Sequence, residues 1–224
     1  MENLQNAFRA YRYHGCIGLL DGLNYVLRLF LNARKKYTPT VLEAIIFGEH
    51  QERMKSGNHR TVDYEQMKKD GSLALQDVLD SVREDRPASF EDLHAIVSQH
   101  TRRVNGVGVL TAYDIALRIG FLQEELLLPR DKVYIQAGAL TGIQNLSENP
   151  EWAALFPADI VWKEGGVYDM ALFRKPFEGM GDMCESMFIE DFLCVYDNLL
   201  GTPAHADVRK LQGCTFPNVV KLFQ

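Results

Sequence analysis

Apolar residues recur three and four positions apart along most of the chain, and this spacing constrains the fold more than any other feature. Four such stripes are Leu23, Val26, Leu27, Phe30 and Leu31; Val41, Leu42, Ile45 and Ile46; Leu75, Val78, Leu79 and Val82; and Phe90, Leu93, Ile96 and Val97. This spacing puts each set on one face of a helix. No alternating strand pattern competes with it before residue 146. The sequence therefore predicts a mainly α fold, a multi-helix orthogonal bundle.

Helix boundary signals accompany these stripes. Thr40 and Glu43 have the spacing of a capping box, as do Ser89 and Asp92. Arg86 precedes Pro87, and a residue before proline disfavours helical angles. Small residues at Ala137, Gly138 and Gly142 indicate a helix that packs tightly against a neighbour. We expect helices to begin and end at these points.

The pattern loosens between residues 147 and 184, where Gly165 and Gly166 separate short apolar pieces. This composition predicts a short β-hairpin or an irregular insertion near residues 155–180. We divide the chain into a helical region at 1–146, an insertion or lid at 147–184, and C-terminal helices at 185–224. A single domain with an insertion fits the same pattern.

Composition excludes several classes of protein. Hydrophobic residues make up 46% and charged residues 24% of the 224 residues, which is typical of a globular protein and not of a disordered one. No run of 18 apolar residues could span a bilayer, and the polar start is unlike a secretory signal. Four dispersed cysteines favour reduced thiols. We expect a soluble cytoplasmic protein without a membrane partner.

The net charge of −6 hides an uneven distribution. Residues 1–60 carry nine Lys or Arg and five Asp or Glu, whereas residues 61–100 carry four and nine. An acidic protein is a poor general binder of nucleic acid. The basic residues of the first quarter could nevertheless form a local cationic surface, and they include Arg34, Lys35, Lys36, Arg53, Lys55 and Arg60.

Residues 93–120 combine two helical stripes with a glycine turn. The first stripe runs to Val104, Gly106, Val107 and Gly108 form the turn, and a second helix opens near Thr111 and Ala112. This segment resembles the helix-hairpin-helix motif of DNA repair and replication proteins. The resemblance implies a fold unit that binds a nucleic-acid backbone without strong sequence specificity.

The physical chemistry of the segment agrees with that implication. Glycine permits positive φ angles, and free N–H groups at the start of a helix attract a phosphate. We therefore expect weak backbone contacts to nucleic acid from one set of residues: Gly106, Val107, Gly108, Thr111, Arg102, Arg103 and Arg118. A structural corner that only docks a protein partner, in a non-enzymatic interaction module, fits the same residues.

The sequence leaves open whether the protein is an enzyme. Helix-hairpin-helix glycosylases carry a catalytic aspartate after the motif, and their bifunctional members carry a hairpin lysine. Leu110 stands at the lysine position here and cannot form an imine. Asp131 is the candidate for the aspartate, although it equally suits the N-cap of a helix that begins near Lys132.

A second resemblance links three segments to an uncharacterised bacterial family of unknown function. The segments are Tyr113-Asp114-x-Ala116-x-Arg118-Ile119-Gly120, Val133-Tyr134-Ile135-x-Ala137-Gly138 and Ile189-Glu190-Asp191-x-Leu193-Cys194-x-Tyr196. Gln136 stands where that family pattern has a histidine. The resemblance implies a polar cluster of Tyr113, Asp114, Arg118, Tyr134, Glu190 and Asp191, in which Arg118 would be a buried architectural clamp.

The adjacent acids Glu190 and Asp191 lie in a strongly apolar helix. We expect one face of that helix to be solvated; the alternatives are a divalent cation or a pair with Arg118. Cys184, Cys194, His205 and Cys214 lack the short spacing of zinc ligands. We therefore predict no metal site and no cofactor.

Overall fold

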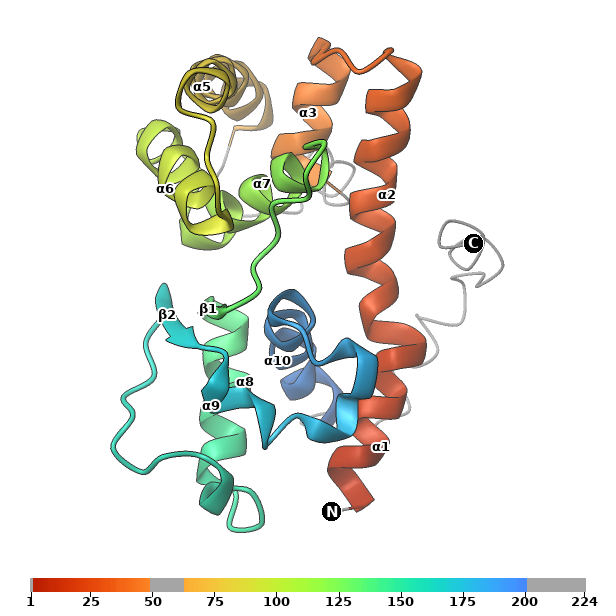
Figure 1. Cartoon of the computed structure of the whole chain (residues 1–224), viewed down its shortest axis with the longest axis vertical. Helices are drawn as coiled ribbons and strands as arrows, with labels where there is room; N and C mark the ends of the chain where they lie inside the picture. The colour runs from red at the N-terminus through yellow and green to blue at the C-terminus, as the bar shows by residue number, and fades with distance from the viewer. Residues whose placement is uncertain (1, 49–62, 201–224) are drawn as a thin grey trace. The chain divides into compact units, whose positions relative to one another are not determined.

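The protein is mainly helical in its computed structural model, which describes residues 2–48 and 63–200 (Figure 1). The chain forms two compact units. Unit 1 contains residues 1–20 and 129–224, and unit 2 contains residues 21–128. This division differs from the segments 1–146, 147–184 and 185–224 that sequence patterns suggest. Arg53, Lys55, Arg60, His205 and Cys214 lie outside the described residues.

Unit 2 is built from the helices that the apolar stripes predict. They are α2 (Cys16–Asn32), which begins in unit 1, α3 (Pro39–Phe47), α5 (Tyr64–Asp85), α6 (Phe90–Thr101) and α7 (Val109–Phe121). Val41, Ile45, Leu75, Val78 and Leu93 are each at most 1% exposed. The helical spacing of apolar residues therefore identifies the faces that form the core of this unit.

Two predicted helix starts have different outcomes. Ser89 caps α6 as expected, because its hydroxyl oxygen accepts a hydrogen bond from the Asp92 N–H at 3.1 Å. The predicted Thr40 capping box is wrong, since Thr38 caps α3 and Pro39 occupies the first turn. Glu43 is 9% exposed and instead accepts from the Tyr64 hydroxyl and pairs with Lys68 Nζ at 2.7 Å. This residue therefore joins α3 to α5.

Unit 1 combines helices with a two-stranded antiparallel sheet. Its elements are α1 (Glu2–Ala10), the π-helix η1 (Tyr11–Gly15), β1 (Lys132–Ile135), α8 (Ala137–Glu148), η3 (Ala153–Leu155), β2 (Gly166–Asp169), α9 (Ala171–Arg174), η4 (Glu178–Met183) and α10 (Ser186–Leu200). In the sheet, Lys132 pairs with Asp169 and Ile135 with Gly166.

The position of β1 corrects one expectation. β2 lies in the segment for which a hairpin was predicted, but its partner strand precedes residue 146, where no strand was expected. The reason is the length and burial of β1: it has only four residues, and Val133, Tyr134 and Ile135 are all buried. A short strand without an exposed alternate position carries no period-2 signal.

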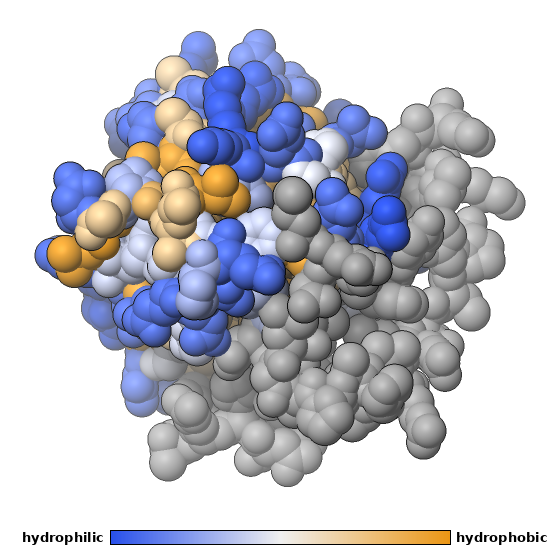
Figure 2. Space-filling model, turned by 90° about the horizontal axis from the view of Figure 1, so that it is seen from below, coloured by the Kyte–Doolittle hydropathy of each residue, from blue (hydrophilic) through white to orange (hydrophobic). Residues whose placement is uncertain are grey.

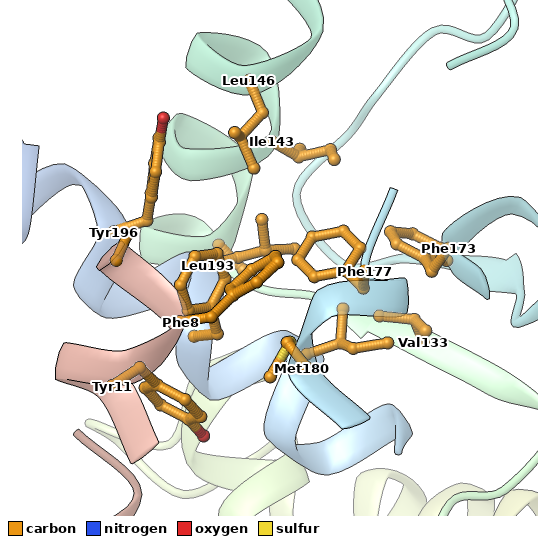
Figure 3. Close-up of a cluster of buried hydrophobic side chains, with 14 of the residues drawn as sticks. Phe8, Tyr11, Val133, Ile143, Leu146, Phe173, Phe177, Met180, Leu193 and Tyr196 are labelled. Carbon is orange, nitrogen blue, oxygen red and sulfur yellow. The ribbon is translucent and has the colours of Figure 1, made fainter. Parts of the chain in front are cut away.

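The core of unit 1 combines aliphatic side chains with a cluster of aromatic rings from distant segments (Figure 3). Phe8 of α1 packs against Phe192 of α10 with ring centroids 4.9 Å apart. Phe177, which lies between α9 and η4, packs against Phe192 at 5.7 Å. Such edge-on pairs add stabilisation to the burial of the rings. Phe192 and Phe177, which also packs against Phe8, thus join α1 to the last third of the chain.

A few large hydrophobic side chains are exposed on the surface of the described part of the chain. Figure 2 shows one face, and in its coloured part hydrophobic residues gather over a limited area among hydrophilic ones. Val161 is 70% exposed and Val167 is 49% exposed in the segment that includes β2. Scattered exposure of this kind is ordinary in globular proteins.

The helices α8 and α10 approach closely because α8 carries small residues on the facing side. A Cβ at Gly138 would lie 3.1 Å from Cys194 Sγ, and one at Gly142 would collide with the carbonyl oxygen of Leu193. The prediction of a tightly packed helix from Ala137, Gly138 and Gly142 is confirmed at these two glycines. Glycine at position 142 is therefore required by the neighbouring backbone.

We predict that Gly142→Ala lowers the free energy of unfolding by about 1 to 3 kcal/mol, because a backbone carbonyl cannot move aside as a flexible side chain can. Gly18→Ala in α2 is the matched control, since nothing lies within 4 Å of the added Cβ. That variant should gain about 0.5 to 1 kcal/mol, as alanine usually does in a helix. Urea unfolding of both variants measures the difference, and equal effects would contradict the close approach.

Candidate functional site

The hairpin between α6 and α7 is held by short backbone hydrogen bonds and one buried side chain. The Val104 N–H donates to the Thr101 carbonyl at 2.8 Å, and the Val107 N–H donates to the Val104 carbonyl at 3.1 Å. Val104 is 4% exposed and anchors the turn in unit 2. Gly106 has φ +91°, a conformation that glycine adopts without strain.

The start of α7 is open. Gly108 is its N-cap, no side chain caps the helix, and a Cβ at Gly108 would meet nothing within 4 Å. The first intrahelical hydrogen bond runs from the Ala112 N–H to the Gly108 carbonyl at 3.0 Å. The preceding N–H groups of Val109, Leu110 and Thr111 therefore have no acceptor within the helix.

Two cations and two exposed apolar residues surround this helix start. Arg102 and Arg103 follow α6 and are exposed. Arg103 Nη2 pairs with Asp77 Oδ2 of α5 at 2.8 Å, so part of its charge is neutralised. Val109 is 49% and Leu110 is 40% exposed, whereas Val107 and Thr111 are half-buried. The hairpin therefore presents backbone N–H groups, apolar side chains and one cation, Arg102, outside the Asp77 ion pair.

Arg118 does not join this surface. It is 7% exposed, and its Nη1 donates to the carbonyl oxygens of Ile45 at 3.0 Å and Ile46 at 3.4 Å. Its Nη2 lies 3.6 Å from Asp114 Oδ2. The expectation that Arg118 contacts nucleic acid is therefore wrong, because its guanidinium is engaged at the carboxyl end of α3. Its other predicted role, as a buried clamp, is the one that these distances describe.

We predict that Arg118→Ala lowers the free energy of unfolding by about 3 kcal/mol or more, because two buried carbonyls lose their donors and Asp114 loses its cation. Arg103→Ala is the control. It breaks an ion pair whose side chains are 70% and 50% exposed, so its cost should stay under about 1 kcal/mol. Urea unfolding compares the two; a cost at Arg118 no larger than that at Arg103 would contradict the clamp.

The basic corner of Arg34, Lys35 and Lys36, between α2 and α3, lies far from the hairpin. The corner is exposed and leads directly to Tyr37, which lies beside the Gln123 side chain. Gln123 follows the C-terminal end of α7, and the hairpin is at the opposite end of this 13-residue helix. At 1.5 Å per residue, about 20 Å separates the two ends. The cations of the corner and those of the hairpin therefore do not form the one continuous surface that the sequence led us to expect.

The acidic pair of α10 lies in unit 1 and is more buried than expected. Glu190 is 6% exposed, and its Oε1 accepts a hydrogen bond from the Cys194 thiol at 3.2 Å. Asp191 is half-buried and accepts from the Tyr11 hydroxyl at 3.0 Å. The expectation of a solvated face is therefore wrong for Glu190, because local sequence does not reveal which neighbours cover a helix.

Cys16 and Tyr11 share the environment of Asp191. Burial first, and then the Asp191 carboxylate, raise the pKa of the Cys16 thiol from 9.0 to about 11. The same two causes hold the pKa of Tyr11 well above its ordinary value. Both groups are therefore protonated at neutral pH. Sequence reasoning missed them, although Leu4, Ala7, Phe8 and Tyr11 form a helical stripe that marks Tyr11 as inward-facing.

We predict that this cluster weakens the fold at alkaline pH. A thiol whose pKa is raised by folding contributes stability that is complete below the unfolded pKa of 9.0 and is lost as the pH rises toward 11. Wild type should therefore lose more free energy of unfolding between pH 9 and 11 than Cys16→Ala, which has no thiol to ionise. Chemical unfolding across that range tests this, and parallel pH profiles would contradict it.

The six residues of the second resemblance are divided between the units. Tyr113, Asp114 and Arg118 lie on α7 in unit 2, whereas Tyr134, Glu190 and Asp191 lie in unit 1. Tyr113 is fully buried and packs edge-on against Phe90 with centroids 5.8 Å apart. It is therefore part of the core of unit 2. Gln136 is 2% exposed, and its Oε1 has no hydrogen-bond partner among the described residues.

Asp131 is exposed and directly precedes β1. The expectation that it caps a helix near Lys132 is wrong, because Lys132 begins a strand instead. Its carbonyl accepts a hydrogen bond from the Met170 N–H at 2.9 Å, which places its backbone beside the end of β2. Asp131 thus lies at the edge of the two-stranded sheet, where its backbone is bonded and the residue is exposed.

Neither a metal site nor a membrane span is found among the described residues. Within residues 2–48 and 63–200, no group of three or more His, Cys, Asp or Glu side chains is arranged to hold a metal ion. No helix in this part of the chain is both long and apolar enough to cross a membrane. A scan against models of known families and searches of curated proteins and solved structures each found no match.

Proposed function

We propose that the α6–α7 hairpin binds the phosphate backbone of nucleic acid, weakly and without sequence specificity. The observation that supports this proposal is the open start of α7, where no side chain caps the helix and the space beside Gly108 is empty. Uncapped N–H groups and the positive end of the helix dipole favour an anion at this point. Nucleic acid is available in the cytoplasm, where the dispersed cysteines lead us to expect the protein.

The charges near the hairpin set the expected strength of binding. Arg102 adds attraction, whereas Asp77 takes part of the charge of Arg103. The overall charge of −6 opposes approach to a polyanion. We expect the hairpin to make about two to three phosphate contacts, from Arg102 and the uncapped N–H groups. Such contacts position the backbone and do not read bases.

We predict that wild type binds labelled DNA or RNA in fluorescence anisotropy at low salt. Each phosphate contact contributes a slope of about −0.9 in log affinity against log salt. Two to three contacts should therefore reduce the affinity about 10- to 40-fold between about 50 and 200 mM salt.

Gly108→Asp is the sharpest variant, because aspartate caps the helix and occupies the same N–H groups with a carboxylate. We expect nucleic-acid affinity to fall at least tenfold while stability stays equal or rises by a few tenths of a kcal/mol. Gly108→Asn makes the same cap without the charge and should retain more binding. Absence of binding by wild type, or full binding by Gly108→Asp, would contradict the proposal and leave Val109 and Leu110 as a surface for a protein partner.

A further inference from the structure

An open cleft lies in unit 2 at the end opposite the hairpin. Its volume is about 350 Å³, and it is lined by Tyr37, Leu79, Val82, Arg83, Arg86 and Gln123. That volume is at the small end of the range for ligand sites in proteins. The cleft is therefore large enough for a small organic molecule.

The floor of the cleft is apolar and ordered by packing. Leu79 is 9% exposed on α5, and Val82 lies less than one turn farther along the same helix. The Tyr37 ring packs against Phe30 with centroids 4.9 Å apart. Gln123 Nε2 donates to the Ile119 carbonyl at 3.1 Å, which holds that side chain at the end of α7. An apolar body could contact the leucine, the valine and the ring together.

The charge of the cleft is positive. Arg83 and Arg86 line it, and its six described lining residues include no acid. Arg83 Nη1 pairs with Asp80 Oδ1 at 2.7 Å, and this exposed pair offsets part of the charge of Arg83. Arg86 has no such ion pair in the described part of the chain. The balance of about one uncompensated cation suits a monoanion better than a phosphate dianion.

The backbone of Arg86 is a second observation at the same place. Arg86 is the C-cap of α5 and has φ 48° and ψ 68°, which is the left-handed conformation. Glycine and asparagine are the usual residues there, and a long side chain is disfavoured. Arg34 and Lys35 adopt the same conformation outside the cleft, so this backbone sets the position of the Arg86 side chain and does not by itself mark a site. An arginine is thus held where helix capping alone would favour a glycine.

Tyr37 and Gln123 add hydrogen-bonding groups to the cations. Burial raises the pKa of Tyr37, while the Gln123 hydrogen bond and the Arg83 charge act in the opposite direction. Tyr37 therefore keeps its proton at neutral pH and remains a donor. The planar guanidinium of Arg86 presents paired N–H groups that match the geometry of a carboxylate.

We propose that this cleft binds a small monocarboxylate with an apolar aromatic or aliphatic body. The carboxylate pairs with Arg86, and its body covers Leu79, Val82 and the Tyr37 ring. This site shares no lining residue with the hairpin, and the proposal does not rest on the function proposed for the hairpin.

The test is calorimetric titration of the full chain with benzoate and octanoate, each compared with its neutral alcohol, benzyl alcohol or octanol, at constant ionic strength. We expect the carboxylates to bind at least tenfold more tightly than the alcohols. Phenyl phosphate should bind no better than benzoate. Equal binding of acid and alcohol, or no binding of either acid, would overturn the proposal.

Arg86→Gly gives the decisive variant, because glycine relieves the left-handed backbone and removes the cation. We expect its thermal stability to be equal to or above that of wild type while benzoate affinity falls at least tenfold. Lys35→Gly is the matched control: Lys35 also has a left-handed backbone, φ 57°, and lies outside the cleft lining. Loss of binding in Lys35→Gly, or unchanged binding in Arg86→Gly, would contradict the assignment.

Discussion

The organisation of unit 2 depends on one buried cation at the end of a helix. The buried guanidinium of Arg118 donates to two carbonyls of α3 and lies beside the Asp114 carboxylate. The desolvation of a guanidinium is costly, and it is offset here by hydrogen bonds, by the opposite charge and by the negative end of the α3 dipole. Gly48 leaves room for the guanidinium, since a Cβ there would collide with it. The helices α3 and α7 are therefore joined by charge-assisted hydrogen bonds as well as by apolar contact.

Unit 1 is organised in a different way. Aromatic rings pack around Phe192 in its core, and the two residues directly before Phe192 on α10, Glu190 and Asp191, have hydrogen-bond partners in Cys194 and Tyr11. Buried polar groups of this kind require hydrogen bonds, because the interior gives them no water. The same helix thus supplies both a central aromatic ring of the core and a buried carboxylate.

The helices could be predicted from sequence because a period of three to four residues is a local property. The cap at Ser89 and the small residues of α8 were equally local and were confirmed. The strand β1, the burial of Glu190 and the α3 carbonyls that Arg118 contacts could not be predicted, since each depends on segments far away in the chain. The hairpin was visible as a glycine pattern, whereas the cleft joins the corner at Tyr37 to α5 and Gln123 and left no local signal.

The π-helix η1 has a consequence for how the start of the chain can vary. An α-helix turns by about 100° per residue, so one surplus residue would rotate everything that precedes it by that angle. A π turn takes up such a residue in a wider loop of backbone. The π turn at Tyr11–Gly15 keeps Phe8 and Tyr11 directed at α10, and the apolar face of α2 keeps its own direction. The number of residues between α1 and α2 therefore sets the rotation of α1 about its own axis. A deletion there would turn the aromatic face of α1 away from Phe192.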